Sequence, residues 1–234
     1  MRKKAPVVIP MKNDEIKTQS YVLRRTNYGE ADRILNLITP EGKIAVMAKG
    51  VRKAKSKMAG GVEMFTLSEI NVHRGKSEIM TLTGVKMVRH YGEIVKDLAR
   101  MELAGMILGR VNALAPEGAA TQEYFRIVDE GLFAINAGAD LGVVEAWVIL
   151  NLLRAAGEEV NLYRDASGAR LVAEGRYDWD NMEKAFCLRE DGKFGAEEIK
   201  MMRLMVSSKL LVATRVVGYE KWIAKILSLC RIMI

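Results

Sequence analysis

Apolar and polar residues alternate over short distances in the first 88 residues, which is the pattern of β-strands. β-Branched and aromatic residues are frequent there and suit a pleated, half-buried surface. Residues 39–42 (TPEG) predict a turn, because proline presets φ and glycine tolerates positive φ. A second hairpin is expected around residues 74–77. The expected strands cover residues 15–23, 33–39, 43–49, 64–73 and 78–85.

This number and spacing of strands favour a small closed barrel of the OB type, with a small open sheet as the alternative. We therefore predict an OB-fold nucleic-acid-binding domain over residues 13–88. Residues 1–12 are basic and contain two prolines, which indicates a disordered tail, and Met11 is an alternative start.

The period changes to that of helices after residue 88. Residues at helical spacing form two stripes, each expected on one face of a helix. The first consists of Ile94, Leu98, Met101, Gly105 and Leu108, and the second of Tyr124, Val128, Gly131 and Ile135. Asp140 is the expected N-cap of a third helix that reaches Ala156, is apolar nearly all round and stops at Gly157. Helical spacing returns at 196–213 and 219–230.

Residues 161–195 lack that spacing and predict an irregular or small β insert. The predicted fold class is therefore α+β: an N-terminal OB-type β-barrel followed by an all-α helical bundle at 89–234, with a small irregular insert.

Positive charge is concentrated in the predicted barrel. The net charge of the chain is +7, and residues 1–88 hold 17 Lys and Arg against 8 Asp and Glu. The remainder holds 19 against 21 and is close to neutral. Such an asymmetry favours a polyanionic partner, nucleic acid before an anionic membrane surface.

The densest part of this charge is a run of six cations without an acid between residues 43 and 57. Small residues separate the cations, so we expect a flexible, open loop that follows a phosphate backbone. A solvated loop that serves solubility is the alternative. The candidate DNA-binding residues of the run are Lys43, Lys49, Arg52, Lys53, Lys55 and Lys57.

Three residues outside the run are further candidates. Arg24 follows the first strand, and Arg33 opens the second, where an ion pair with Glu30 or Asp32 is the competing interpretation. Tyr28 is the expected platform for a stacked base, whereas we expect Phe65 in the core. Because rings are few, binding should be mostly electrostatic and sensitive to salt.

Catalytic chemistry is not indicated. Two cysteines and two histidines provide no metal-ligand spacing, and no phosphate-binding loop occurs. We therefore expect no enzyme activity, no metal and no cofactor. The lack of a disulfide framework, of a secretion signal and of an apolar stretch long enough for a membrane span favours a cytoplasmic protein.

Residues 28–34 (YGEADRI), 37–43 (LITPEGK) and 48–57 (AKGVRKAKSK) resemble the bacterial RecO family of recombination mediators. The resemblance implies binding to single- and double-stranded DNA and annealing of complementary strands. It also implies cooperation with RecR, RecA and the single-strand-binding protein SSB in repair at the nucleoid.

Many RecO proteins carry a four-cysteine zinc module, whereas residues 161–195 contain only Cys187, so zinc is not expected. Two other functions stay open at this point: an OB-fold factor for RNA or ribosome assembly, and a protein-docking scaffold whose basic loop binds an acidic partner.

Overall fold

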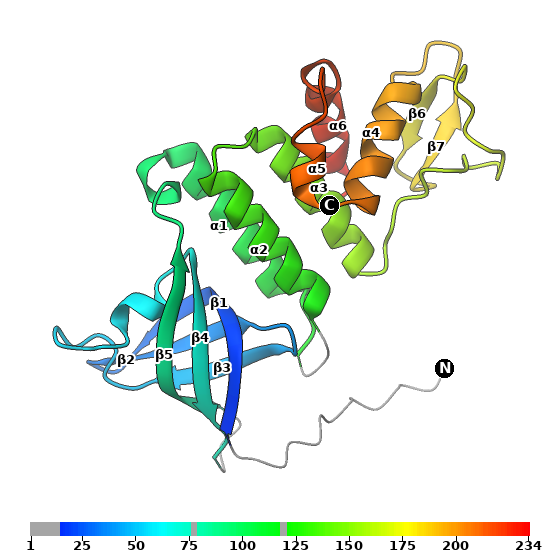
Figure 1. Ribbon diagram of the computed structural model, residues 1–234. Helices are drawn as coiled ribbons and strands as arrows, with labels where there is room; N and C mark the ends of the chain where they lie inside the picture. The colour runs from blue at the N-terminus through cyan, green and yellow to red at the C-terminus, as the bar shows by residue number, and fades with distance from the viewer. Residues whose placement is uncertain (1–14, 76–78, 118–120) are drawn as a thin grey trace, which may run out of the picture. The chain divides into compact units, whose positions relative to one another are not determined.

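The computed structural model describes residues 15–75, 79–117 and 121–234 (Figure 1). The tail predicted at residues 1–12 lies outside these ranges, as does part of the turn predicted at 74–77. The fold is α+β as predicted, because the chain forms a five-stranded sheet first and helices afterwards.

The elements follow the order of the prediction, and no helix in the described ranges is both long and apolar enough to cross a membrane. The strands are β1 (Glu15–Tyr28), β2 (Asp32–Ile38), β3 (Lys43–Ala48), β4 (Thr66–His73), β5 (Met80–His90), β6 (Tyr177–Asp180) and β7 (Ala185–Leu188). The helices are η1 (Ala59–Val62), η2 (Ile94–Lys96), α1 (Leu98–Leu114), α2 (Gln122–Asn136), α3 (Leu141–Ala155), α4 (Ala196–Ser207), α5 (Leu210–Ala213) and α6 (Glu220–Ile232).

The first five strands close into a barrel in the order β1-β2-β3-β5-β4. β1 closes the barrel because its first half pairs with β4 and its second half with β2, both antiparallel. This double pairing carries β1 to Tyr28, five residues beyond the predicted end at Leu23. A register shift between Val22 and Arg24 marks the bend from one partner to the other.

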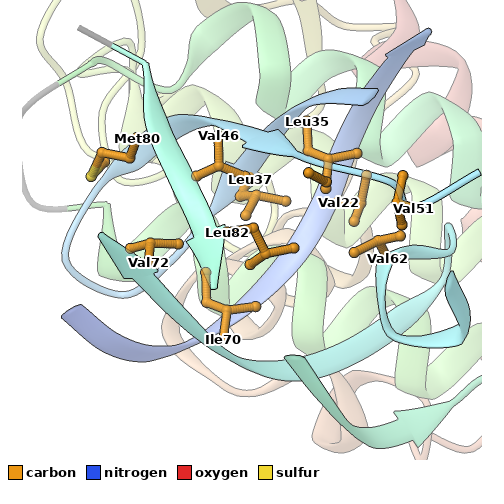
Figure 2. Close-up of a cluster of buried hydrophobic side chains, with 11 residues drawn as sticks. Val22, Leu35, Leu37, Val46, Val51, Val62, Ile70, Val72, Met80 and Leu82 are labelled. Carbon is orange, nitrogen blue, oxygen red and sulfur yellow. The ribbon is translucent and has the colours of Figure 1, made fainter. Parts of the chain in front are cut away.

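Alternate residues of the strands fill the barrel. Leu35 and Val46 face each other in register on β2 and β3, and neither is exposed to solvent. Val51 and Val62, from the segment between β3 and β4, join the same cluster (Figure 2). The segment that carries the basic residues therefore also contributes to the core.

α1 and α2 belong to the same compact unit as the barrel, which ends at Asn136. Thr121, just before α2, donates a hydrogen bond to the carbonyl of Thr39 at 2.7 Å. Asn36 of β2 donates to the side chain of Asn112 on α1 at 3.3 Å. These contacts join α1 and α2 to the barrel in one compact unit, whereas the predicted domain boundary lies at 88/89.

The buried face of α1 differs from the predicted stripe. Leu98 and Met101 are 70% and 39% exposed, and Gly105 is exposed as well. Asp97 caps the helix by accepting from the amide of Arg100, so Ile94 lies in a separate turn, out of phase with α1. Leu108 of the predicted stripe is buried, and the rest of the buried face of α1 consists of Leu103, Ala104, Ile107 and Val111. The stripe predicted for α2 is buried throughout.

The second compact unit begins at Ala137. Asp140 caps α3 through the amide of Val143, as predicted, and the middle of α3 is buried all round. The helical spacing predicted over 196–213 is divided, because α4 ends at Ser207 and α5 begins at Leu210. The insert contains the antiparallel pair β6-β7, so it is a small β insert more than an irregular one.

Candidate nucleic-acid interface

A turn-rich loop that we call the basic loop, residues 49–57, follows β3 and carries most of the predicted cations. Backbone hydrogen bonds from Lys53 to Gly50 (3.1 Å) and from Ser56 to Lys53 (2.9 Å) form its turns. All five of its cations are exposed, namely Lys49, Arg52, Lys53, Lys55 and Lys57. No described residue forms an ion pair with any of them. Their charges therefore face solvent and can meet a polyanion.

The start of the basic loop is attached firmly to the barrel. Val51 is 2% exposed and packs in the barrel core. Gly50 adopts a φ of +65°, and its amide donates to Oδ1 of Asp32 at 2.7 Å. We expected a flexible loop throughout, whereas the structure fixes its first residues. A fixed origin limits the volume that the cations sample and keeps them concentrated at one place.

Arg52 connects the basic loop to the turn between β1 and β2. Its amide donates to the carbonyl of Ala31 at 2.9 Å, and Nη1 of its guanidinium donates to the carbonyl of Gly29 at 3.0 Å. Tyr28 immediately precedes this turn and is 56% exposed. The structure therefore brings the predicted stacking residue next to the origin of the predicted phosphate-binding loop.

Arg24 and Arg25 lie on opposite faces of β1, because successive residues of a strand alternate. Arg24 is exposed. Arg25 pairs with Glu63, and so does Arg33 of β2, whose Nη1 is 3.4 Å from Oε1 of Glu63. Arg33 therefore forms an ion pair, but its partner is Glu63, 30 residues away in the sequence, and not Glu30 or Asp32 as the competing interpretation expected.

Lys43 is separated from the other predicted cations. Its Nζ donates to the carbonyl of Asn112 at 3.0 Å, near the end of α1, and lies 3.9 Å from a carboxylate oxygen of Glu117. Its side chain is only 13% exposed. A cation is favourable there because the last carbonyl groups of a helix lack partners in the helix. Lys43 thus holds α1 on the barrel and does not add to the exposed charge.

Two residues of this region escaped the sequence-based prediction. Arg25 directly follows the candidate Arg24 in the sequence, but the alternation of a strand that continues beyond Leu23 places it on the other face. Glu63 carried no local signal, because its partners lie 38 and 30 residues away in the sequence.

The fold and this surface define an α+β protein whose small closed barrel presents an attached cationic loop, an arrangement suited to binding a phosphate backbone. The family model described as recombination protein O N terminal matches residues 11–91. With the relatives described next, this match shows that the chain belongs to the RecO family.

The chain is similar to proteins named DNA repair protein RecO. It is 34% identical to that of Dehalococcoides mccartyi (strain CBDB1) over 152 residues, which cover 64% of this chain and 60% of the relative. The identity to the protein of Anaeromyxobacter sp. (strain K) is 32%, and the match covers 71% of this chain and 66% of the relative. The identity to the protein of Roseiflexus sp. (strain RS-1) is 30%, and the match covers 70% of this chain and 58% of the relative. The chain thus matches less than two thirds of the length of these curated relatives.

Proposed function

We propose that this protein is a DNA-binding recombination mediator, which anneals complementary single strands and helps to load a recombinase on DNA coated with single-strand-binding protein. The observation that carries the proposal is the cluster of five exposed, unpaired cations on a loop fixed to the barrel. Membership of the RecO family supports the place of this activity in DNA repair and recombination. The OB type that we assign to the barrel rests on its strand order and its family.

The basic loop is suited to grip the phosphate backbone of DNA. Phosphate neutralisation requires charge more than exact placement, and lysine side chains adapt to a backbone of variable geometry. If four to six phosphates of a single strand are neutralised, the plot of log K against log salt concentration has a slope of roughly −3 to −4. Tyr28 is an exposed ring beside the loop, and we assign it to base stacking.

The same loop offers a mechanism for annealing. Two single strands repel each other through their phosphates, and a dense group of cations lowers that repulsion. Cations bound to phosphates leave the base edges free to pair. A surface with few rings has a further advantage, because bases stacked on aromatic side chains would have to leave them before they could pair.

We further propose that the chain acts by binding alone, without catalysis, metal or cofactor, in the cytoplasm at the nucleoid. RecR-type and RecA-type proteins and the single-strand-binding protein are the partners that we assign to it. The basis for these partners is the family, whose members considered above are named DNA repair proteins.

An annealing assay across a salt series tests the proposal. Complementary strands, one of them labelled with a fluorophore, are mixed bare or coated with single-strand-binding protein, with and without this protein. We expect faster annealing in both cases, and the acceleration should decline steeply as salt rises. A rate that equals that of the strands alone at low salt would refute the proposal, and an acceleration confined to RNA hairpins would favour an RNA-binding factor.

A further inference from the structure

Two arginines on neighbouring strands share one carboxylate at the end of the barrel. Arg25 of β1 and Arg33 of β2 are close in the antiparallel register, since Arg25 lies opposite Leu35 and Arg33 opposite Asn27. Both guanidinium groups contact Glu63, one at each carboxylate oxygen. Glu63 thus bridges them in the way that an oxyanion would.

Glu63 is held in place by its neighbours in the sequence. Val62 is 1% exposed and belongs to the barrel core. Gly61 accepts a hydrogen bond from the hydroxyl of Ser68 at 2.8 Å, and a side chain at this position would collide with Val85. The backbone at Glu63 is therefore fixed, whereas its side chain is 44% exposed and can turn towards solvent.

The two arginines remain accessible to a ligand that replaces the carboxylate. The side chains of Arg25 and Arg33 are 28% and 23% exposed. Guanidinium groups bind phosphate oxygens with the same geometry as carboxylate oxygens, and ion pairs between partly exposed side chains are weak. A phosphate can therefore compete with Glu63 for both groups.

We propose that Arg25 and Arg33 form a phosphate site for the DNA backbone, which Glu63 occupies until DNA displaces it. The inference rests on the proposed function and extends it to a residue that restrains binding. Arg33 lies opposite Ala48, which directly precedes the basic loop, and the amide of Arg52 donates to the carbonyl of Ala31, two residues before Arg33, so the site lies close to the origin of the basic loop. A strand that lies along the basic loop can therefore extend to the two arginines.

Removing the competing carboxylate tests the site. Binding of a fluorescein-labelled single-stranded oligonucleotide is followed by fluorescence anisotropy over a salt series. Glu63→Gln should tighten binding about fivefold, the fold-change expected when two weak, partly exposed ion pairs no longer compete with DNA. The double variant Arg25→Ala/Arg33→Ala should bind more weakly, with a salt slope about 1.4 units shallower. Glu63→Gln added to that double variant should produce no gain.

The matched control is Glu69→Gln, which changes the net charge equally at a carboxylate that pairs with Lys17, 3.8 Å away. An equal gain in this control, or a gain from Glu63→Gln without the two arginines, would overturn the inference because net charge would then explain it. An unchanged affinity in Glu63→Gln would also overturn it. If the unaltered protein does not bind the oligonucleotide at all, the proposed function fails instead.

A second measurement needs no change at Glu63. The Nε–H NMR signals of Arg25 and Arg33, assigned through their lysine variants, should shift on addition of the oligonucleotide. The signal of Arg231, which pairs with Glu145 at 2.7 Å in the other compact unit, should not. Signals of Arg25 and Arg33 that stay in place while the protein binds DNA would contradict displacement of Glu63.

Discussion

The hydroxyl of Tyr21 donates a hydrogen bond to Oδ1 of Asp129 at 2.6 Å and thereby joins β1 to α2. The Tyr21 side chain has no exposure to solvent, and its oxygen lies 3.0 Å from that of Tyr91. Its ring also packs against Phe125, with 5.5 Å between the ring centroids. One tyrosine therefore fastens a helix to the barrel that carries the candidate interface.

Tyr21→Phe should lower the free energy of unfolding by about 2 kcal/mol, because it leaves the Asp129 carboxylate without this charge-assisted bond. Urea denaturation measures the change. Tyr28→Phe is the matched control: this tyrosine is 56% exposed, so removal of its hydroxyl should leave stability within about 0.5 kcal/mol. Equal losses in both variants would show that the bond to Asp129 is not responsible.

Stability should also depend on alkaline pH through Tyr21. Burial, with help from Tyr91 and Asp129, raises the pKa of Tyr21 far above its ordinary value. The unfolded chain releases the phenol proton near about pH 10, whereas the folded chain keeps it. The free energy of unfolding therefore falls as the pH rises above about 10. Above that pH, the difference in the free energy of unfolding between the unaltered protein and Tyr21→Phe should become smaller. A difference that stays constant would contradict this assignment.

The basic loop should determine DNA annealing. Replacing Arg52, Lys53, Lys55 and Lys57 with alanine should abolish annealing, and Lys53→Ala/Lys55→Ala/Lys57→Ala alone should make the salt slope about 2 units shallower. Far-UV circular dichroism should be unchanged, because these side chains are exposed. The control Lys209→Ala/Arg215→Ala/Lys221→Ala removes the same charge as the triple loop variant, from exposed positions in the other compact unit. Annealing that survives in the fourfold variant, or a salt slope that becomes equally shallow in the control, would reassign the DNA contact.

Two glycines, Gly50 in the basic loop and Gly105 on α1, should respond in opposite ways to substitution by alanine. Gly50→Ala should destabilise the protein by about 1 kcal/mol, because a side chain is unfavourable at a φ of +65°. Gly105→Ala should stabilise it by about 0.5–1 kcal/mol, because Gly105 is exposed on α1 with no atom near its Cβ position. Thermal denaturation distinguishes them. A loss in both variants would mean that α1 is covered at Gly105.

The small β insert should keep its fold without metal. Phe186 is buried between Trp179 and Phe194, with ring centroids 5.3 and 5.7 Å away. Among the residues that the structure describes, no three His, Cys, Asp or Glu side chains form a metal-binding group. We expect EDTA to leave the melting temperature unchanged. Phe186→Ala should cost about 3–5 kcal/mol, whereas Met182→Ala, at a 93% exposed position, should cost little. A lower melting temperature in EDTA would reveal a bound metal.

Local patterns predicted the strands, several helix ends and the exposed charge. The start of β3 at Lys43 and the cap of α3 at Asp140 depend on residues within a few positions, so the sequence indicates them directly. The buried face of α1 was harder to predict from the sequence, because Leu98 and Met101 are as apolar as the residues of α1 that are buried. The packing of α1 against β1, η2 and α2 decides which of these residues are buried.

The sequence by itself therefore determined an α+β protein with a strand-rich, cationic first third and a loop of exposed cations. The tertiary structure decided which cations remain free. It assigns Lys43 to the end of α1 and pairs Arg33 with Glu63, 30 residues away. It also closes β1 onto β4, where Glu15 lies opposite His73. The physical reason is that charge and alternation are local properties of the chain. Ion pairs and barrel closure instead depend on distances in space, which appear only when distant segments have packed together.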